Sequence, residues 1–184
     1  MSVLSLEALS RLARHLWLDA DDAFRALGED GLDRLEQRVS ASERRHSGQI
    51  CLCVEASLPL RYLWRNLRHG EAIGDIVRDR AITVFGKQRV WDTEYNNGVL
   101  IYVQLAEHLI EIVADRGLAR HVDAAHWHAI VEPLGAACRG GRLESGLEAA
   151  IDAVGHELET WFPLHAADAP GDPDRNLDNR ARIR

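Results

Sequence analysis

Residues 92–117, with the sequence DTEYNNGVLIYVQLAEHLIEIVADRG, decide the fold. Two apolar runs, VLIYVQLA and LIEIVAD, are separated only by Glu107 and His108, which predicts two strands joined as an antiparallel hairpin. A turn centred on Glu107 would place Asp115 beside Val99. The end of the second strand would therefore return to the polar loop that precedes the first.

Carboxylate and amide side chains crowd that polar loop, and one more carboxylate follows the second strand. Oxygen ligands that arrive from two neighbouring turns suit a hard divalent cation. Because the hairpin brings both turns to one edge of the sheet, we expect this corner to hold one ion. The predicted ligands of calcium, or of another divalent cation such as magnesium, are Asp92, Glu94, Asn96, Asn97 and Asp115.

The same residues allow an interpretation without a metal. The Asn-Asn-Gly sequence that ends at Gly98 is typical of a turn in which the amide side chains bond to backbone groups. In that interpretation Asp115 pairs with Arg116 or Arg89. The spacing also resembles the first ligands of an EF-hand loop, but the glycine comes one position late and Val103 stands where the last acid belongs. Both interpretations stay open on the sequence alone.

The segments around the hairpin complete a mixed α/β pattern. The run ICLCVEASL from Ile50 is apolar on both faces and predicts a buried strand. A helix over residues 75–87 connects it to the hairpin, which predicts a parallel pairing that also brings Glu43 and His46 to the corner. Further helices are expected over residues 5–17, up to Leu27, from Leu32 to near Gly48, and over 123–138 and 143–161. The predicted fold class is α/β, a small mixed sheet of three to four strands with helices on both faces.

Three regions are expected along the chain. Residues 1–30 form an N-terminal helical extension, and residues 31–165 form the α/β domain. Residues 166–184 contain Pro170, Pro173 and a balanced mixture of Asp and Arg, which predicts an extended, flexible tail.

The composition limits the class of protein. The chain has 184 residues and a net charge of −7, which argues against a nucleic-acid partner because such a partner requires a basic face. Its three cysteines are too few for a disulfide framework. No apolar run reaches the ~20 residues that cross a bilayer. We therefore expect no transmembrane segment and a cytoplasmic location.

The N-terminal helix carries an apolar stripe. Its members are Leu4, Leu9, Leu12, Leu16 and Trp17. We expect this stripe to face the core, and the alternative is a peripheral membrane contact.

The sequence resembles the TPM domain family, which is named for members in the thylakoid lumen, in photosystem II repair and in acetylcholine-receptor modulation. The resemblance is carried by SERRHSGQICLCVEASLP from Ser42, by the hairpin stretch, by Trp127 with its helix, by GLEAAIDAV from Gly146 and by ELETWFP from Glu157. It covers about residues 36–163 and is most specific from NNGVLIYV to VADRG.

The resemblance implies an α/β sandwich and, in several members, bound calcium or another divalent ion. Acid phosphatase activity has been attributed to some members, and others act as assembly or repair factors. Many members carry a signal peptide and a membrane helix, and the sequence shows neither. Pro133, inside an expected helix, is a further departure from the family pattern.

Two functions follow as expectations. The first is a divalent-cation-binding domain that serves as an interaction, assembly or repair module for a protein partner. The second is a weak metal-dependent acid phosphatase. In that mechanism the ion polarises the phosphoryl group, Arg116 or Arg89 steadies the developing charge and His46 acts as general acid. The sequence favours the first function, because the corner is acidic and lacks a recognisable nucleophile.

Overall fold

The computed structural model describes residues 6–28, 30–164 and 182–183. Leu4 and most of the predicted tail lie outside the described residues. The helices are α1 (Leu6–Trp17), α2 (Ala20–Leu27), α3 (Gly31–Glu43), α4 (Leu60–His69), α5 (Ile73–Lys87), α6 (Arg116–Ala119), α7 (Ala124–Arg139) and α8 (Leu143–Trp161), and the strands are β1 (Gln49–Glu55), β2 (Gly98–Gln104), β3 (Leu109–Ala114) and β4 (Arg182–Ile183).

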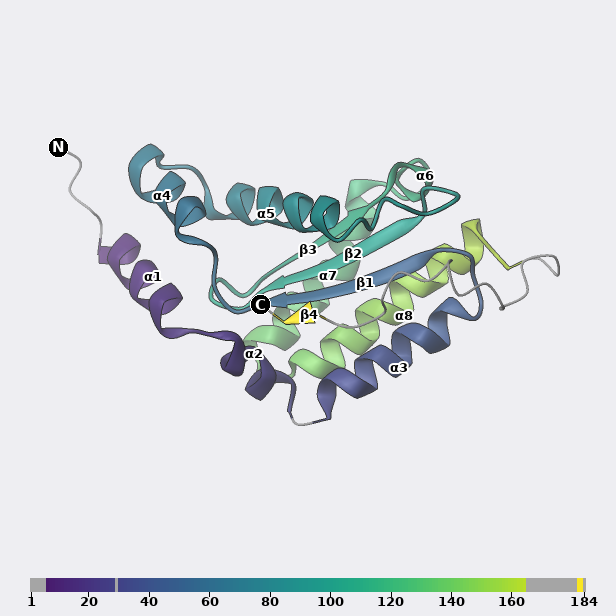
Figure 1. Cartoon of the computed structure of the whole chain (residues 1–184), viewed down its shortest axis with the longest axis horizontal. Helices are drawn as coiled ribbons and strands as arrows, with labels where there is room; N and C mark the ends of the chain where they lie inside the picture. The colour runs from purple at the N-terminus through teal and green to yellow at the C-terminus, as the bar shows by residue number, and fades with distance from the viewer. Residues whose placement is uncertain (1–5, 29, 165–181, 184) are drawn as a thin grey trace.

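The four strands form one mixed sheet in the order β3-β2-β1-β4. β1 runs parallel to β2, with Gln49 opposite Gly98, and β2 runs antiparallel to β3. In Figure 1, α5 lies on one side of the strands, and α3 and α8 lie on the other. The predicted α/β class, with a mixed sheet covered on both faces, is confirmed.

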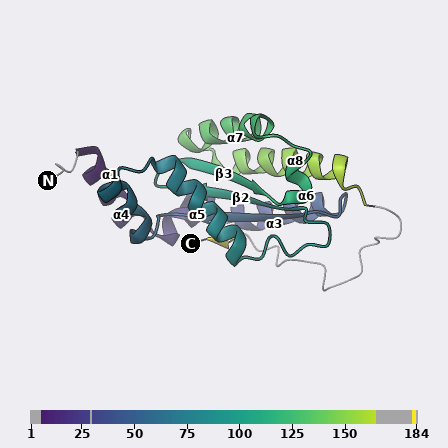
Figure 2. The ribbon, with the colours of Figure 1, turned by 90° about the horizontal axis from the view of Figure 1, so that it is seen from above.

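Successive strand residues face two different cores. Leu52 and Ile101 belong to the core that contains residues of α3, α7 and α8. Cys53 and Leu100 belong to the core beneath α4 and α5. Figure 2 shows α7 and α8 side by side along the first of these cores. Because both faces are covered, every residue of β2 is buried, which is why this strand reads as a continuous apolar run.

The register of the hairpin differs from the prediction by one residue. Val99 lies opposite Ala114 rather than beside Asp115. The backbone N–H of Asp115 instead donates to the carbonyl of Gly98 at 2.9 Å. The end of β3 still returns to the start of β2, so the predicted corner exists with its pairing displaced by one position.

The connection between β2 and β3 explains the displacement. It spans the four residues 105–108 rather than two. The N–H groups of Leu105 and Ala106 donate to the carbonyls of Glu55 and Ala56, at 3.0 and 3.1 Å. These two residues therefore continue along the end of β1 and do not extend the pairing with β3.

A buried ion pair joins the sheet to α5. Arg80 donates to both carboxylate oxygens of Glu55, at 2.8 and 2.6 Å, and the Tyr102 hydroxyl donates to the same carboxylate at 2.5 Å. All three side chains are buried. Burial is the largest reason that the pKa of Tyr102 is raised, followed by the charge of Glu55. Because removing one partner would leave a buried charge unpaired, the group fixes how α5 sits on the sheet.

The apolar stripe of α1 mostly faces outward. Leu12 packs against the core beneath α4 and α5, but Leu9, Leu16 and Trp17 are exposed, Trp17 to 84%. The expectation that this stripe faces the core is therefore wrong for these three residues, while Leu4 is not described. The physical reason is that polar contacts, rather than this stripe, attach α1 to the domain.

His15 is the centre of that attachment. Its Nδ1 accepts from the N–H of Leu58 at 3.0 Å, so its Nε2 carries the proton of the neutral ring and donates to Glu107 at 3.0 Å. Arg14 donates to the carbonyl of Ala106 at 2.6 Å. The first helix is thus attached to the ends of β1 and β2 through hydrogen bonds.

Part of the predicted tail joins the sheet. β4 pairs in parallel with β1, with Arg182 opposite Cys53 and Ile183 opposite Val54. Residues 165–181, which precede it, are outside the described residues. None of the described helices is both long enough and apolar enough to cross a bilayer.

Candidate functional site

Two loops meet at the corner of the sheet, at the far end of the molecule from α1 (Figure 1). One is the segment before β2, and the other joins β3 to α6. Besides the bond from Asp115 to Gly98, the N–H of Gly117 donates to the carbonyl of Asn96 at 2.8 Å. Backbone hydrogen bonds therefore hold the two loops together before any side chain is considered.

Two glycines allow this close approach. A Cβ on Gly98 would overlap the carbonyl oxygen of Val90, and a Cβ on Gly117 would overlap the carbonyl oxygen of Tyr95. Gly98 is needed for space, because its φ lies outside the left-handed region. The corner is thus a close backbone contact that larger residues would disrupt.

Asn97 and Asp115 lie on the two loops of this contact, one on each. Asn97 is fully buried; its side-chain amide donates to Ser47 Oγ at 3.3 Å, and its N–H donates to Thr93 Oγ1 at 3.0 Å. One oxygen of Asp115 accepts from the N–H of Arg116 at 2.7 Å and caps α6. Within the described part of the chain, Asn97 Oδ1 and Asp115 Oδ2 are buried acceptors without a hydrogen-bond partner.

The other predicted ligands are differently engaged. The side-chain oxygen of Asn96 accepts from the Arg116 guanidinium at 3.0 and 2.9 Å, while Asp92 and Glu94 are exposed. Over residues 6–28, 30–164 and 182–183, no three His, Cys, Asp or Glu side chains gather as a metal-binding group. The structure therefore joins Asn96 and Asp115 through Arg116. It places the Asn97 side chain against Ser47, and within the described residues it does not collect the three carboxylates around one point.

The contacts of Asp115 also bear on the interpretation without a metal. Its bond to Arg116 is made with the backbone N–H, whereas the guanidinium of Arg116 is bonded to Asn96. The oxygen of Asp115 that caps α6 thus bonds to a backbone N–H and not to the predicted side chain of Arg116 or Arg89. This bond does not account for the second, buried oxygen.

His46 and Glu43 lie at the same sheet edge in structural roles. His46 is buried; its Nδ1 bonds to the carbonyl of Gly48 and its Nε2 to Ser42 Oγ, both at 3.0 Å. Burial lowers the pKa of His46 to about 4, so the ring is neutral at pH 7 and has no acidic proton to donate. Glu43 accepts from the N–H of Ile50 at 2.9 Å. Neither residue is available as the general acid that the phosphatase expectation required.

Exposed aromatic side chains surround the corner, and the sequence analysis did not identify them. Trp91 and Tyr95 belong to the loop before β2, and Trp161 ends α8; all three are exposed. His121 stacks on Trp161 with ring centroids 4.3 Å apart. Large aromatics inside a polar loop were the available signal, because a loop that only turns the chain has no need of them.

Comparisons with known proteins agree on the type of domain. The family model described as the TPM domain matches residues 21–157. A solved structure with a similar fold is the NMR structure of the BA42 protein from the psychrophilic bacterium Bizionia argentinensis, with a TM-score of 0.64 and 23% sequence identity, over 81% of this chain and 92% of that one. No curated protein matches the chain.

Proposed function

The chain belongs to the TPM domain family, and from this premise we propose that its corner binds a divalent cation, calcium or magnesium, and presents a recognition surface to a protein partner. The observation that carries the proposal is the pair of buried oxygens, Asn97 Oδ1 and Asp115 Oδ2, that have no hydrogen-bond partner in the described part of the chain. A buried acceptor left unsatisfied costs about 1–3 kcal/mol. A hard cation would relieve that cost at both oxygens together.

The chemistry of these donors suits a weak oxygen-ligand site. A carboxylate and an amide oxygen are typical calcium ligands, and water fills the remaining positions. Asp92 and Glu94 lie on the loop that carries Asn97 and are the carboxylates that a loop rearrangement would add. Asn96 is excluded as long as Arg116 occupies its oxygen. With a single charged ligand in place, we expect a dissociation constant of about 1 mM.

The surroundings of the corner support a role in recognition. Trp91, Tyr95 and Trp161 are exposed beside it, and Tyr and Trp are the side chains that most often dominate protein–protein binding energy. Backbone hydrogen bonds fix the two loops, so little order would be lost on association. The corner would thus act as an interaction, assembly or repair module.

The phosphatase alternative has less support. His46 is neutral and buried, and the corner shows no activated nucleophile. Arg116 and Arg89 remain as cations that could face a phosphate, and a generic aryl phosphate assay with and without the metal measures this directly. Hydrolysis that requires the cation and disappears in Asp115→Asn would favour the phosphatase over the adaptor.

The binding experiment is a thermal melt in 10 mM calcium and in 10 mM magnesium. At ten times the expected dissociation constant, linkage stabilises the folded state by about 1.4 kcal/mol, which raises Tm by about 3–5 °C. Asp115→Asn should abolish the rise, because asparagine keeps the helix cap and loses the charge. Asp123→Asn is the matched control, since Asp123 also caps a helix, α7, and is not one of the predicted ligands. No rise in the wild type, or an equal loss in the control, would contradict the proposal.

A further inference from the structure

The two helices at the opposite end from the corner, α1 and α4, each carry a row of apolar side chains that faces away from the core. On α1 it consists of Leu9, Ala13 and Leu16, and on α4 of Leu60, Trp64 and Leu67; both sets have the i, i+4, i+7 spacing of one helix face. All six side chains are exposed or only partly buried, Trp64 being 57% exposed. Figures 1 and 2 both show α1 and α4 side by side at this end.

This end is also basic, although the protein is acidic. The sequence of α4 contains three arginines and no acidic residue, and α1 contains two arginines and Glu7. Arg65 is paired with Glu71 and Asp79, whereas Arg61 and Arg68 are exposed and form no salt bridge with any described residue. In a chain with a net charge of −7, these two arginines leave uncompensated positive charge on α4.

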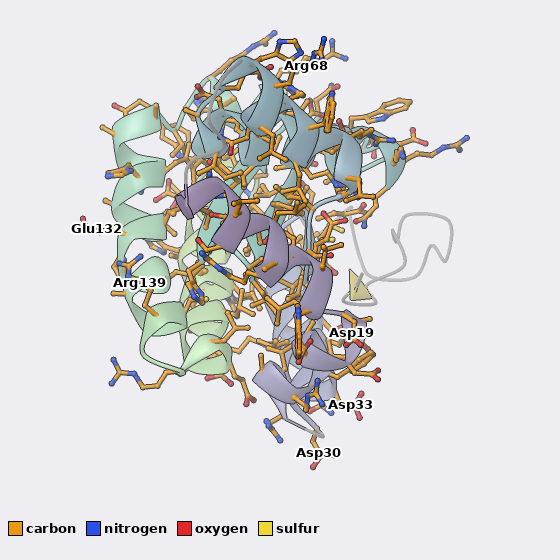
Figure 3. All side chains as sticks on the ribbon, turned by 90° about the vertical axis from the view of Figure 1, so that its left-hand side faces the viewer. Asp19, Asp30, Asp33, Arg68, Glu132 and Arg139 are labelled. Atoms are coloured by element: carbon orange, nitrogen blue, oxygen red, sulfur yellow. The ribbon has the colours of Figure 1, made fainter. Side chains whose placement is uncertain are left out.

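The charge is polarised across the end of the molecule. Figure 3 views this end and shows Arg68 at one edge, while Asp19, Asp30 and Asp33 lie at the opposite edge. A flat anionic surface that approaches from the α4 side would meet arginines, with these carboxylates held away from it. The arrangement thus favours one orientation over the others.

We propose that the surface formed by α1 and α4 docks on an anionic lipid bilayer. The leucines and Trp64 would enter the headgroup region, where the amphipathic indole ring is favoured. The guanidinium groups of Arg61 and Arg68 would bind lipid phosphates, for which their planar donor geometry is suited. The protein would lie on the membrane and not span it.

A second copy of the chain fits this surface less well. A two-fold dimer places the same patch of each subunit against its own equivalent. Arg61 and Arg68 would then approach their counterparts, and α4 has no carboxylate to pair with them. Charge complementarity therefore selects an anionic partner.

The surface is preformed. Arg11 on α1 donates to Asn66 Oδ1 on α4 at 2.8 Å, and its Nε lies 3.1 Å from Glu107. Together with the His15 contacts, this bond fixes the two apolar rows in one arrangement before binding, so docking needs no folding step.

The test is flotation of the full chain with vesicles of phosphatidylcholine alone and of phosphatidylcholine with phosphatidylglycerol, at low and high salt. We expect binding only to the anionic vesicles and release by salt. Arg61→Glu with Arg68→Glu should weaken partitioning by about tenfold or more, and Trp64→Ser should weaken it at every salt concentration. Arg120→Glu with Arg139→Glu makes the same charge change at exposed positions outside α1 and α4 and should bind more tightly than the α4 variant. Far-UV circular dichroism confirms that each variant is folded.

Three results would overturn the proposal. The first is a folded wild type that fails to bind anionic vesicles at low salt, and the second is a control variant that loses as much binding as the α4 variant. The third is a dimer in solution that becomes monomeric in Trp64→Ser, which would assign the surface to a second copy of the chain. The proposal does not rest on the cation site, because Asp115→Asn should bind vesicles like the wild type even if calcium binding fails.

Discussion

Gly98 shows how one residue controls the corner. A glycine is required at this position because a Cβ there would overlap the carbonyl oxygen of Val90. Gly98→Ala should therefore lower the free energy of unfolding by about 3 kcal/mol. Gly74→Ala is the matched control: its Cβ would meet open space in α5, so we expect a gain of about 0.5 kcal/mol. Urea unfolding measures both, and equal stability of the two variants would contradict this account of the corner.

For single residues of the site, the sequence predicted some properties and not others. The residue types and the meeting of the two loops were predictable, because a hairpin must return the end of β3 to the start of β2. The roles of individual oxygens were not. The side-chain oxygen of Asn96 accepts from Arg116, whereas Asn97 Oδ1 has no partner among the described residues, and this difference depends on the exact path of the loop. The spacing of residues in a sequence does not determine the partners of individual side-chain oxygens.

At the scale of elements, α1 is held by polar contacts. The central contact is His15, whose ring accepts from the backbone N–H of Leu58 and donates to the Glu107 carboxylate. His15→Ala leaves a buried N–H without an acceptor, at a cost of about 2 kcal/mol, so amide exchange of α1 should rise about thirtyfold. Hydrogen-exchange mass spectrometry measures this. Leu16→Ala, an exposed change on the same helix, should leave the exchange of the docked helix close to that of the wild type. Unchanged exchange in His15→Ala would show that Leu12 and the contacts of Arg11 and Arg14 hold the helix without His15.

The burial of β2 explains why the predicted register of the hairpin was wrong by one residue. Register is readable from sequence when one face of a strand is polar, because a slip of one residue then exposes the apolar face. Every residue of β2 is buried, so both registers look equally apolar. The deciding interactions, from Leu105 and Ala106 to the end of β1, join residues far apart in the chain. The first three strands, the hairpin and most of the helices were nevertheless predictable from local patterns and caps. The short helix α6 and the strand β4, which falls within the expected flexible tail, were not predicted.

At the scale of the whole molecule, buried His46 makes global stability depend on pH. Its pKa is lowered to about 4 in the folded state, whereas the unfolded chain binds the same proton below about pH 6.5. This stability is therefore fully present above pH 6.5 and is lost as the pH falls toward 4, by about 3 kcal/mol in total. Urea unfolding at pH 7 and pH 4.5 should show a smaller difference in His46→Gln than in the wild type. Equal differences would mean that other groups carry the pH dependence.

The pairing of β4 with β1 has a consequence for how the chain is made. The centre of the sheet closes early, because β1, β2 and β3 all lie in the first two thirds of the sequence. Their neighbour at the outer edge, Arg182–Ile183, follows much later in the sequence. During synthesis, therefore, the outer edge of β1 stays open until this segment has emerged from the ribosome. The newborn domain passes through an interval with an open strand edge, which ends when β4 pairs with β1.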